Sequence, residues 1–133
     1  SRQDIFVRDL VGGTTDRVSL DSASGEANNT SYAGNISSTG RYVTFSSFAT
    51  NLVSGDTNGF TDIFVRDRQL GTTVRVSVDS SGNQANDNSN DPRISGDGRY
   101  VAFDSYATNL VTGDTNTGLY SSGADNLSIV VTQ

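Results

Sequence analysis

An internal repeat with a period of 58 residues limits the folds open to this chain. Residues 4–9, Asp-Ile-Phe-Val-Arg-Asp, recur unchanged as residues 62–67. The same shift, which needs no gap, carries Gly-Arg-Tyr-Val from 40 to 98 and Ala-Thr-Asn-Leu-Val from 49 to 107. A constant period of this size is typical of stacked supersecondary units, none of which can bury its faces alone. The sequence therefore predicts a repeat protein.

The repeat runs out of phase with the chain. Residues 30–86 make one complete unit, while residues 4–28 correspond to the second half of a unit and residues 88–116 to the first half. Residues 118–133 do not follow the pattern. We therefore expect repeats over residues 1–117, followed by a divergent C-terminal strand or tail.

Composition and patterning predict strands joined by turns, with little helix. The 133 residues include 14 Gly and one Pro, and Ser, Thr, Asn and Asp separate short apolar runs. The unbroken apolar run at 5–7 indicates a strand covered on both faces, as a propeller blade is by its neighbours. The class expected is therefore all-β, with β-propeller blades of four antiparallel strands. Strands are expected near 4–8, 14–21, 32–37, 41–47, 62–67 and 72–79.

The residue types that are missing exclude several functions. The chain has no Cys, His, Lys, Met or Trp. Without His there is no His general base and no Ser-His-Asp triad, and no spacing typical of a nucleophile elbow or a catalytic carboxylate pair occurs, so we predict that the protein is not an enzyme. A net charge of −6 disfavours nucleic acid as a partner but suits divalent cations. No apolar run reaches transmembrane length, so membrane insertion is not expected.

Two segments resemble a known family. Ile-Ser-Gly-Asp-Gly-Arg-Tyr-Val-Ala-Phe at 94–103, taken with the strand at 62–67, resembles the TolB-type, WD-like β-propeller repeat. The segment Ala-Thr-Asn-Leu-Val-x-Gly-Asp-Thr-Asn is similar to a variety of that repeat common in secreted bacterial proteins, often beside calcium-associated modules. The first copy of the turn, Ser-Thr-Gly at 38–40, lacks the Asp. The resemblance implies a propeller, a fold that serves as a docking platform, as a gate on peptidases or as a surface module, in an extracellular or periplasmic location.

The loops that end each Ala-Thr-Asn-Leu-Val segment carry candidate metal ligands. Ca²⁺ prefers carboxylate, amide and main-chain oxygens gathered on a flexible loop, and such oxygens are dense here. The alternative is that these side chains only satisfy turn amides, as Asx residues commonly do. In an assembly, the second loop would be completed by an acid from the next subunit. The candidate ligands are Asp56, Asn58, the carbonyl of Phe60, Asp62, Asp114, Asn116 and Asp4.

Aromatic side chains give a second set of candidates. Tyr42, Phe48, Tyr100 and Tyr106 are expected to pack between blades, because aromatic rings are the usual large filler of such cores. The alternative is that Tyr42 and Tyr100 stack on sugar rings in inter-blade clefts. The chain is thus interpreted as a binding or structural module that takes a protein or glycan ligand, with a carbohydrate-binding lectin as the alternative.

The phase of the repeat also predicts assembly. Each chain holds one complete blade and two complementary halves, and half a blade leaves an unpaired edge that proteins pair or cover. Two blades are too few to close a ring of about four to eight. We therefore expect a head-to-tail homo-oligomer, a six-bladed trimer in preference to an eight-bladed tetramer, unless the chain is a fragment of a longer propeller. Alternatively, the apolar tail at 126–132 forms a strand that covers the open edge.

Overall fold

The computed structural model describes residues 2–115 and 127–131. Over these residues the chain is all-β, which confirms the predicted class, and strands are joined by turns and irregular loops without any helix. The described segments accordingly offer no helix that could cross a membrane. The strands are β1 (Phe6–Arg8), β2 (Thr15–Arg17), β3 (Ser31–Ile36), β4 (Tyr42–Ser47), β5 (Asp62–Asp67), β6 (Thr72–Arg75), β7 (Ser89–Ile94), β8 (Tyr100–Ser105) and β9 (Leu127–Val131).

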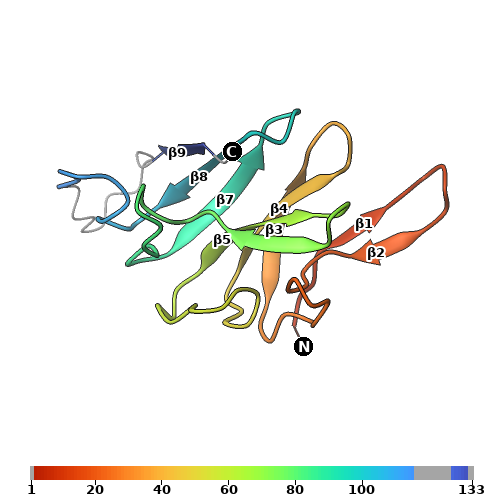
Figure 1. The fold of residues 1–133 in the computed structure, drawn as a ribbon, viewed down its shortest axis with the longest axis horizontal. Helices are drawn as coiled ribbons and strands as arrows, with labels where there is room; N and C mark the ends of the chain where they lie inside the picture. The colour runs from red at the N-terminus through yellow and green to blue at the C-terminus, as the bar shows by residue number, and fades with distance from the viewer. Residues whose placement is uncertain (1, 116–126, 132–133) are drawn as a thin grey trace.

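The strands form three antiparallel sheets. β3, β4, β5 and β6 follow one another in a four-stranded sheet, here called the complete blade, and this confirms the predicted four-stranded unit. β1 and β2 form the N-terminal half-blade, and β7, β8 and β9 form the third sheet. Figure 1 shows the complete blade between the other two, with the N-terminal half-blade on the right and the third sheet on the left.

The repeat holds for strand pairing as well as for sequence. β1 pairs with β2 in the register that β5 has with β6, and β7 pairs with β8 as β3 does with β4. The last two pairs share a bulge at the same place, and each bulge contains a residue with positive φ, 52° at Ala33 and 47° at Asp91. Each unit is therefore built with the same local geometry, unusual backbone included.

The fourth strand of the blade is shorter than predicted. The strand expected at 72–79 ends at Arg75. Three residues on, the Val78 amide donates to the carbonyl of Val76 at 2.9 Å, a tight turn that bends the chain out of the ladder. The strand expected at 14–21 is shortened by the corresponding turn.

Apolar side chains pack on both faces of the complete blade. As a consequence β5 is buried along its whole length. The cluster between the complete blade and the N-terminal segment consists of Ala27, Phe45, Ala49, Leu52 and Phe64, with Ile5 and Val53 beside them. The cluster between the complete blade and the third sheet takes residues from both and consists of Ile63, Val65, Val76, Ala85, Ile94, Val101, Phe103, Ala107 and Leu110, with Tyr42 beside them.

β1 has the sequence of β5 but not its surroundings. The prediction that the run at 5–7 is covered on both faces is wrong for this copy, because Phe6 is 55% exposed whereas Phe64, its equivalent in β5, is 0% exposed. β5 pairs with β4 on one edge and β6 on the other, but within the described residues β1 pairs only with β2. The difference in burial therefore follows from the neighbours of the strand and not from its own sequence.

β9 takes the place on β8 that β5 takes on β4. The C-terminal strand expected at 126–132 lies at Leu127–Val131 and pairs antiparallel with β8, with Tyr100 opposite Val131. In the complete blade, Tyr42 lies opposite Asp67 in the same way. In this structure the edge of β8 that the assembly hypothesis gave to a neighbouring subunit is thus covered by the tail of the same chain.

Candidate functional site

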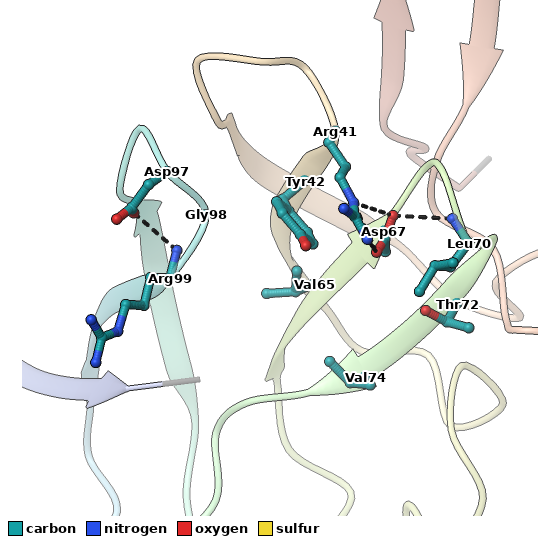
Figure 2. A pocket seen from close by; sticks show the side chains of 10 residues that line it. All are labelled: Arg41, Tyr42, Val65, Asp67, Leu70, Thr72, Val74, Asp97, Gly98 and Arg99. Atoms are coloured by element: carbon teal, nitrogen blue, oxygen red, sulfur yellow. Dashed lines mark hydrogen bonds and ion pairs between the residues drawn. The ribbon is translucent and has the colours of Figure 1, made fainter. Parts of the chain in front are cut away.

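A cleft of about 660 Å³ opens between the complete blade and the β7–β8 turn of the third sheet (Figure 2). It contains one of the predicted ligand residues, Tyr42. Two of its apolar side chains, Leu70 and Val74, are exposed. The lining residues are Arg41, Tyr42, Val65, Asp67, Leu70, Thr72, Val74, Asp97, Gly98 and Arg99. The two Arg and two Asp side chains balance in charge, so the lining is close to neutral. Because apolar side chains line the cleft as well, it is amphipathic.

An ion pair between Arg41 and Asp67 lines the cleft. Arg41 Nε donates to both oxygens of Asp67 at 3.1 Å, and its terminal nitrogen donates to Asp67 Oδ2 at 2.7 Å. Asp67 Oδ1 also accepts from the amides of Gln69 and Leu70, at 2.9 and 3.1 Å. The hydrogen bond from Arg41 is the largest cause that lowers the pKa of Asp67, and the same bond raises the pKa of Arg41. The pair therefore clamps the β5–β6 turn to the start of β4.

Tyr42 packs between blades, as one of the two hypotheses proposed. The Arg41 guanidinium carbon lies 4.8 Å from the centroid of the Tyr42 ring. The ring also lies so close to Gly98 that a Cβ at that position would be 2.2 Å from Tyr42 Cδ2. Stacking a sugar on this ring would require the protein contacts on it to move apart.

The other aromatic candidates are not packed between blades. Phe48, Tyr100 and Tyr106 are exposed, so the packing prediction is wrong for these three. Phe48 contacts Tyr32 at a centroid distance of 6.1 Å, and the Arg99 guanidinium carbon lies 5.0 Å from the Tyr100 ring. Tyr100 follows the same Gly-Arg as Tyr42, but no described blade lies beyond the third sheet to cover it.

The candidate metal ligands of the first loop do come together. Asp56 and Asp62 both contact the Arg75 guanidinium through the same terminal nitrogen, which is 3.3 Å from Asp56 Oδ1 and 3.3 Å from Asp62 Oδ2. Asp62 Oδ1 accepts from Ser77 Oγ at 2.6 Å. Burial first, and then the charge of Asp62, raise the pKa of Asp56, while Arg75 lowers it. One arginine thus contacts both carboxylates.

This arrangement does not fit a calcium ion. Asn58 turns its amide nitrogen toward the carboxylates, since Nδ2 donates to Asp62 Oδ2 at 3.0 Å and to the carbonyl of Ala85 at 3.1 Å. Its oxygen accepts from the amide of Phe60 at 3.1 Å, which is an Asx turn, the alternative to metal binding. The described residues contain no group of three or more acidic side chains placed to hold a metal.

The remaining candidate ligands lie elsewhere. Asp4 accepts from Ser19 Oγ at 2.8 Å and lies 3.8 Å from Arg17 Nε. Asp114 lies at the end of the described residues, and Asn116 lies outside them. The structure therefore leaves the second loop, which was predicted to be completed across subunits, as a prediction.

Sequence reasoning missed Arg75, Ser77 and Gln84. Gln84 Oε1 accepts from Arg75 at 3.0 Å, and Gln84 Nε2 donates to Thr57 Oγ1 at 2.7 Å, which ties the loop to the blade. The repeat carried the signal, because the 58-residue shift places Arg17 and Ser19 on Arg75 and Ser77. A basic and a hydroxyl residue retained two positions apart beside an acidic loop point to an internal polar network.

Comparison with known proteins adds little to this geometry. No family model matches the chain, and no curated protein matches it. Among solved structures, the crystal structure of TolB from Acinetobacter baumannii is similar to 77% of this chain, with 22% identity and a TM-score of 0.47. The matched part is 21% of that protein, so the chain spans about a fifth of its length. The 58-residue repeat of the chain itself remains the stronger indicator of its architecture.

Proposed function

We propose that this chain is a non-enzymatic β-propeller module that assembles with copies of itself by strand addition at β1. One observation carries the proposal: the hexapeptide Asp-Ile-Phe-Val-Arg-Asp occurs twice and is fully buried in β5, whereas in the β1 copy every residue is exposed or only half-buried. A strand with an apolar sequence and an open edge is a template for pairing with another strand. The most suitable strand is the one that covers the buried copy, namely β4 or its repeat, β8.

The repeat fixes the register of the proposed contact. In the complete blade, Thr44 of β4 lies opposite Val65 of β5. Moving Thr44 forward by one repeat gives Ala102, and moving Val65 back by one repeat gives Val7, so Ala102 of one subunit would lie opposite Val7 of the next. β7 and β8 of one chain and β1 and β2 of another then make a four-stranded blade.

Each subunit contributes two blades to such a ring. Three copies give six blades and four copies give eight, both within the range of about four to eight that propellers use. The contact is head-to-tail, so the ring closes only where the rotation between subunits suits the blade number. We expect the trimer first, because three subunits are the fewest that give a ring of more than four blades. The repeat resembles a variety common in secreted bacterial proteins, and for this reason we place the module outside the cytoplasm as part of the proposal.

β9 competes with the neighbour for the edge of β8. It pairs with five residues of β8, from Tyr100 to Asp104. β1 of a second copy would bring to the same edge the sequence Asp-Ile-Phe-Val-Arg-Asp, which β5 uses to pair with β4 in the complete blade. Assembly therefore requires β9 to leave β8.

Engineered cysteines test the proposed contact, because the 133-residue sequence contains none. Val7→Cys and Ala102→Cys in one chain should give intermolecular disulfides and a ladder of products on a non-reducing gel. The control pair Val7→Cys and Val101→Cys is one residue out of register, which turns one side chain to the other face, and should crosslink far less. Equal crosslinking of both pairs, or a non-reducing gel with monomer alone, would contradict the proposal.

A further inference from the structure

The loop at 55–58 meets a cation that belongs to the protein. We propose that Arg75 is the resident cation of this loop: it holds the loop to the blade and excludes a divalent metal ion. The calcium prediction and the structure disagree here, and the disagreement rests on the contacts of Arg75 and Asn58. It is independent of the assembly proposed above.

Burial makes the charge of Arg75 essential to the cluster. The side chains of Asp56 and Asp62 are 4% and 0% exposed, and that of Arg75 is 11% exposed. A buried carboxylate is strongly destabilising without a partner, and removing one member of a buried ion pair leaves its partner uncompensated. Arg75 is the cation that the described structure places against these two carboxylates. One terminal nitrogen of its guanidinium contacts Asp56, Asp62 and Gln84, while its buried Nε has no hydrogen-bond partner among the described residues.

The polar groups around Arg75 are arranged for a donor and not for a metal ion. Gln84 accepts from Arg75 and also accepts from the Thr57 amide at 3.3 Å, so it links the loop to β6. The Asn58 amide nitrogen faces two oxygen acceptors, those of Asp62 and Ala85. Flipping that amide to offer its oxygen to a cation would set it against both acceptors. A calcium ion needs six to eight oxygen ligands, which this cluster cannot supply while Arg75 is present.

The N-terminal half-blade repeats the arrangement of one arginine with two carboxylates, and only the second carboxylate comes from a different position. Arg17 corresponds to Arg75 and lies 3.8 Å from Asp4, the equivalent of Asp62. In this copy the second carboxylate comes from Glu26, which forms an ion pair with Arg17 and stands where Gln84 stands in the other copy. Each arginine thus meets two carboxylates, although the second one comes from a different part of the repeat. The pairing of one arginine with two carboxylates is thus kept in both copies, which supports a structural role for this arginine in each repeat.

Thermal melts in calcium chloride and in excess chelator test the proposal. The unchanged chain should melt at the same temperature in both solutions. Arg75→Met should lower the melting temperature by several degrees, and Arg75→Met with Asp56→Asn should recover part of the loss, because one uncompensated charge is gone. Arg68→Met is the matched control: Arg68 pairs with Asp16 at 3.0 Å, but both side chains are more exposed than those around Arg75, so a smaller change is expected.

Several results would overturn the proposal. A melting temperature of the unchanged chain that rises in calcium chloride and falls in chelator would show that the loop binds calcium with Arg75 in place. An Arg75→Met variant as stable as the Arg68→Met control would show that the arginine does not hold the loop. If Arg75→Met fails to fold, the double variant decides: recovery of a cooperative melt supports a charge effect, and failure to recover contradicts it.

Discussion

The two copies of Phe in Asp-Ile-Phe-Val-Arg-Asp provide a matched pair of substitutions. Phe64 is fully buried against Phe45, at a centroid distance of 5.9 Å, whereas Phe6 is 55% exposed. Phe64→Ala removes a core ring and leaves a cavity, so it should lower the free energy of unfolding by about 3–5 kcal/mol. Phe6→Ala loses only part of the transfer free energy of the ring, about 1 kcal/mol in a dissociated chain.

Urea unfolding followed by circular dichroism measures both variants against the unchanged chain. At low chain concentration the difference between the two costs should be about 2–4 kcal/mol. At high concentration Phe6→Ala should become more costly, because in the proposed assembly Phe6 is covered by β8 of a neighbour. Equal costs at every concentration would refute the account of β1 as the exposed copy. A cost below about 1 kcal/mol for Phe64→Ala would refute the account of the core itself.

Three further predictions concern the cleft and the tail. Gly98→Ala should cost more than Gly113→Ala in urea unfolding: both have positive φ, 78° and 83°, but only at Gly98 would the new Cβ meet a ring, that of Tyr42 at 2.2 Å. Equal costs would refute the close contact. Arg41 holds the pKa of Asp67 below its usual value, so the stability contributed by this carboxylate is complete above about pH 4 and is lost as pH falls through the lowered pKa. Asp67→Asn should therefore remove part of the loss of stability in acid. An unchanged profile of stability against pH would contradict this. Deleting residues 126–133 should raise the assembled fraction on a sizing column, because β9 no longer covers β8, and a fully monomeric deletion variant would argue against competition.

The architecture could be predicted because the repeat is visible without any structure. One hexapeptide and its 58-residue copy predicted the strand β5 with its observed bounds, 62–67. The ends of strands were less predictable. β6 ends at Arg75 because the chain turns between Val76 and Val78, and the apolar alternation of the sequence continues through that turn. The turn also buries Val76 and Ser77 together, although neighbouring residues of a regular strand point to opposite faces.

The surroundings of repeated residues could not be predicted from local sequence. Tyr42 and Tyr100 both stand in Gly-Arg-Tyr-Val, yet one packs against a neighbouring blade and the other is exposed. Likewise the acidic loop had the composition of a calcium site, and the arginine that pairs with Asp56 lies well downstream on β6. Both properties depend on which sheet lies beside the residue, and that is fixed by the packing of the blades and not by the motif.

Light scattering on a sizing column tests the central claim most directly, that the exposed β1 is completed by a second copy. The single chain has a mass of 14.0 kDa. The account predicts a mass that rises with chain concentration toward about 42 kDa, the trimer of six blades, or to the eight-bladed tetramer. A mass of 14.0 kDa that persists to high concentration would contradict it, because β9 would then be the permanent cover of β8 and β1 would remain unpaired.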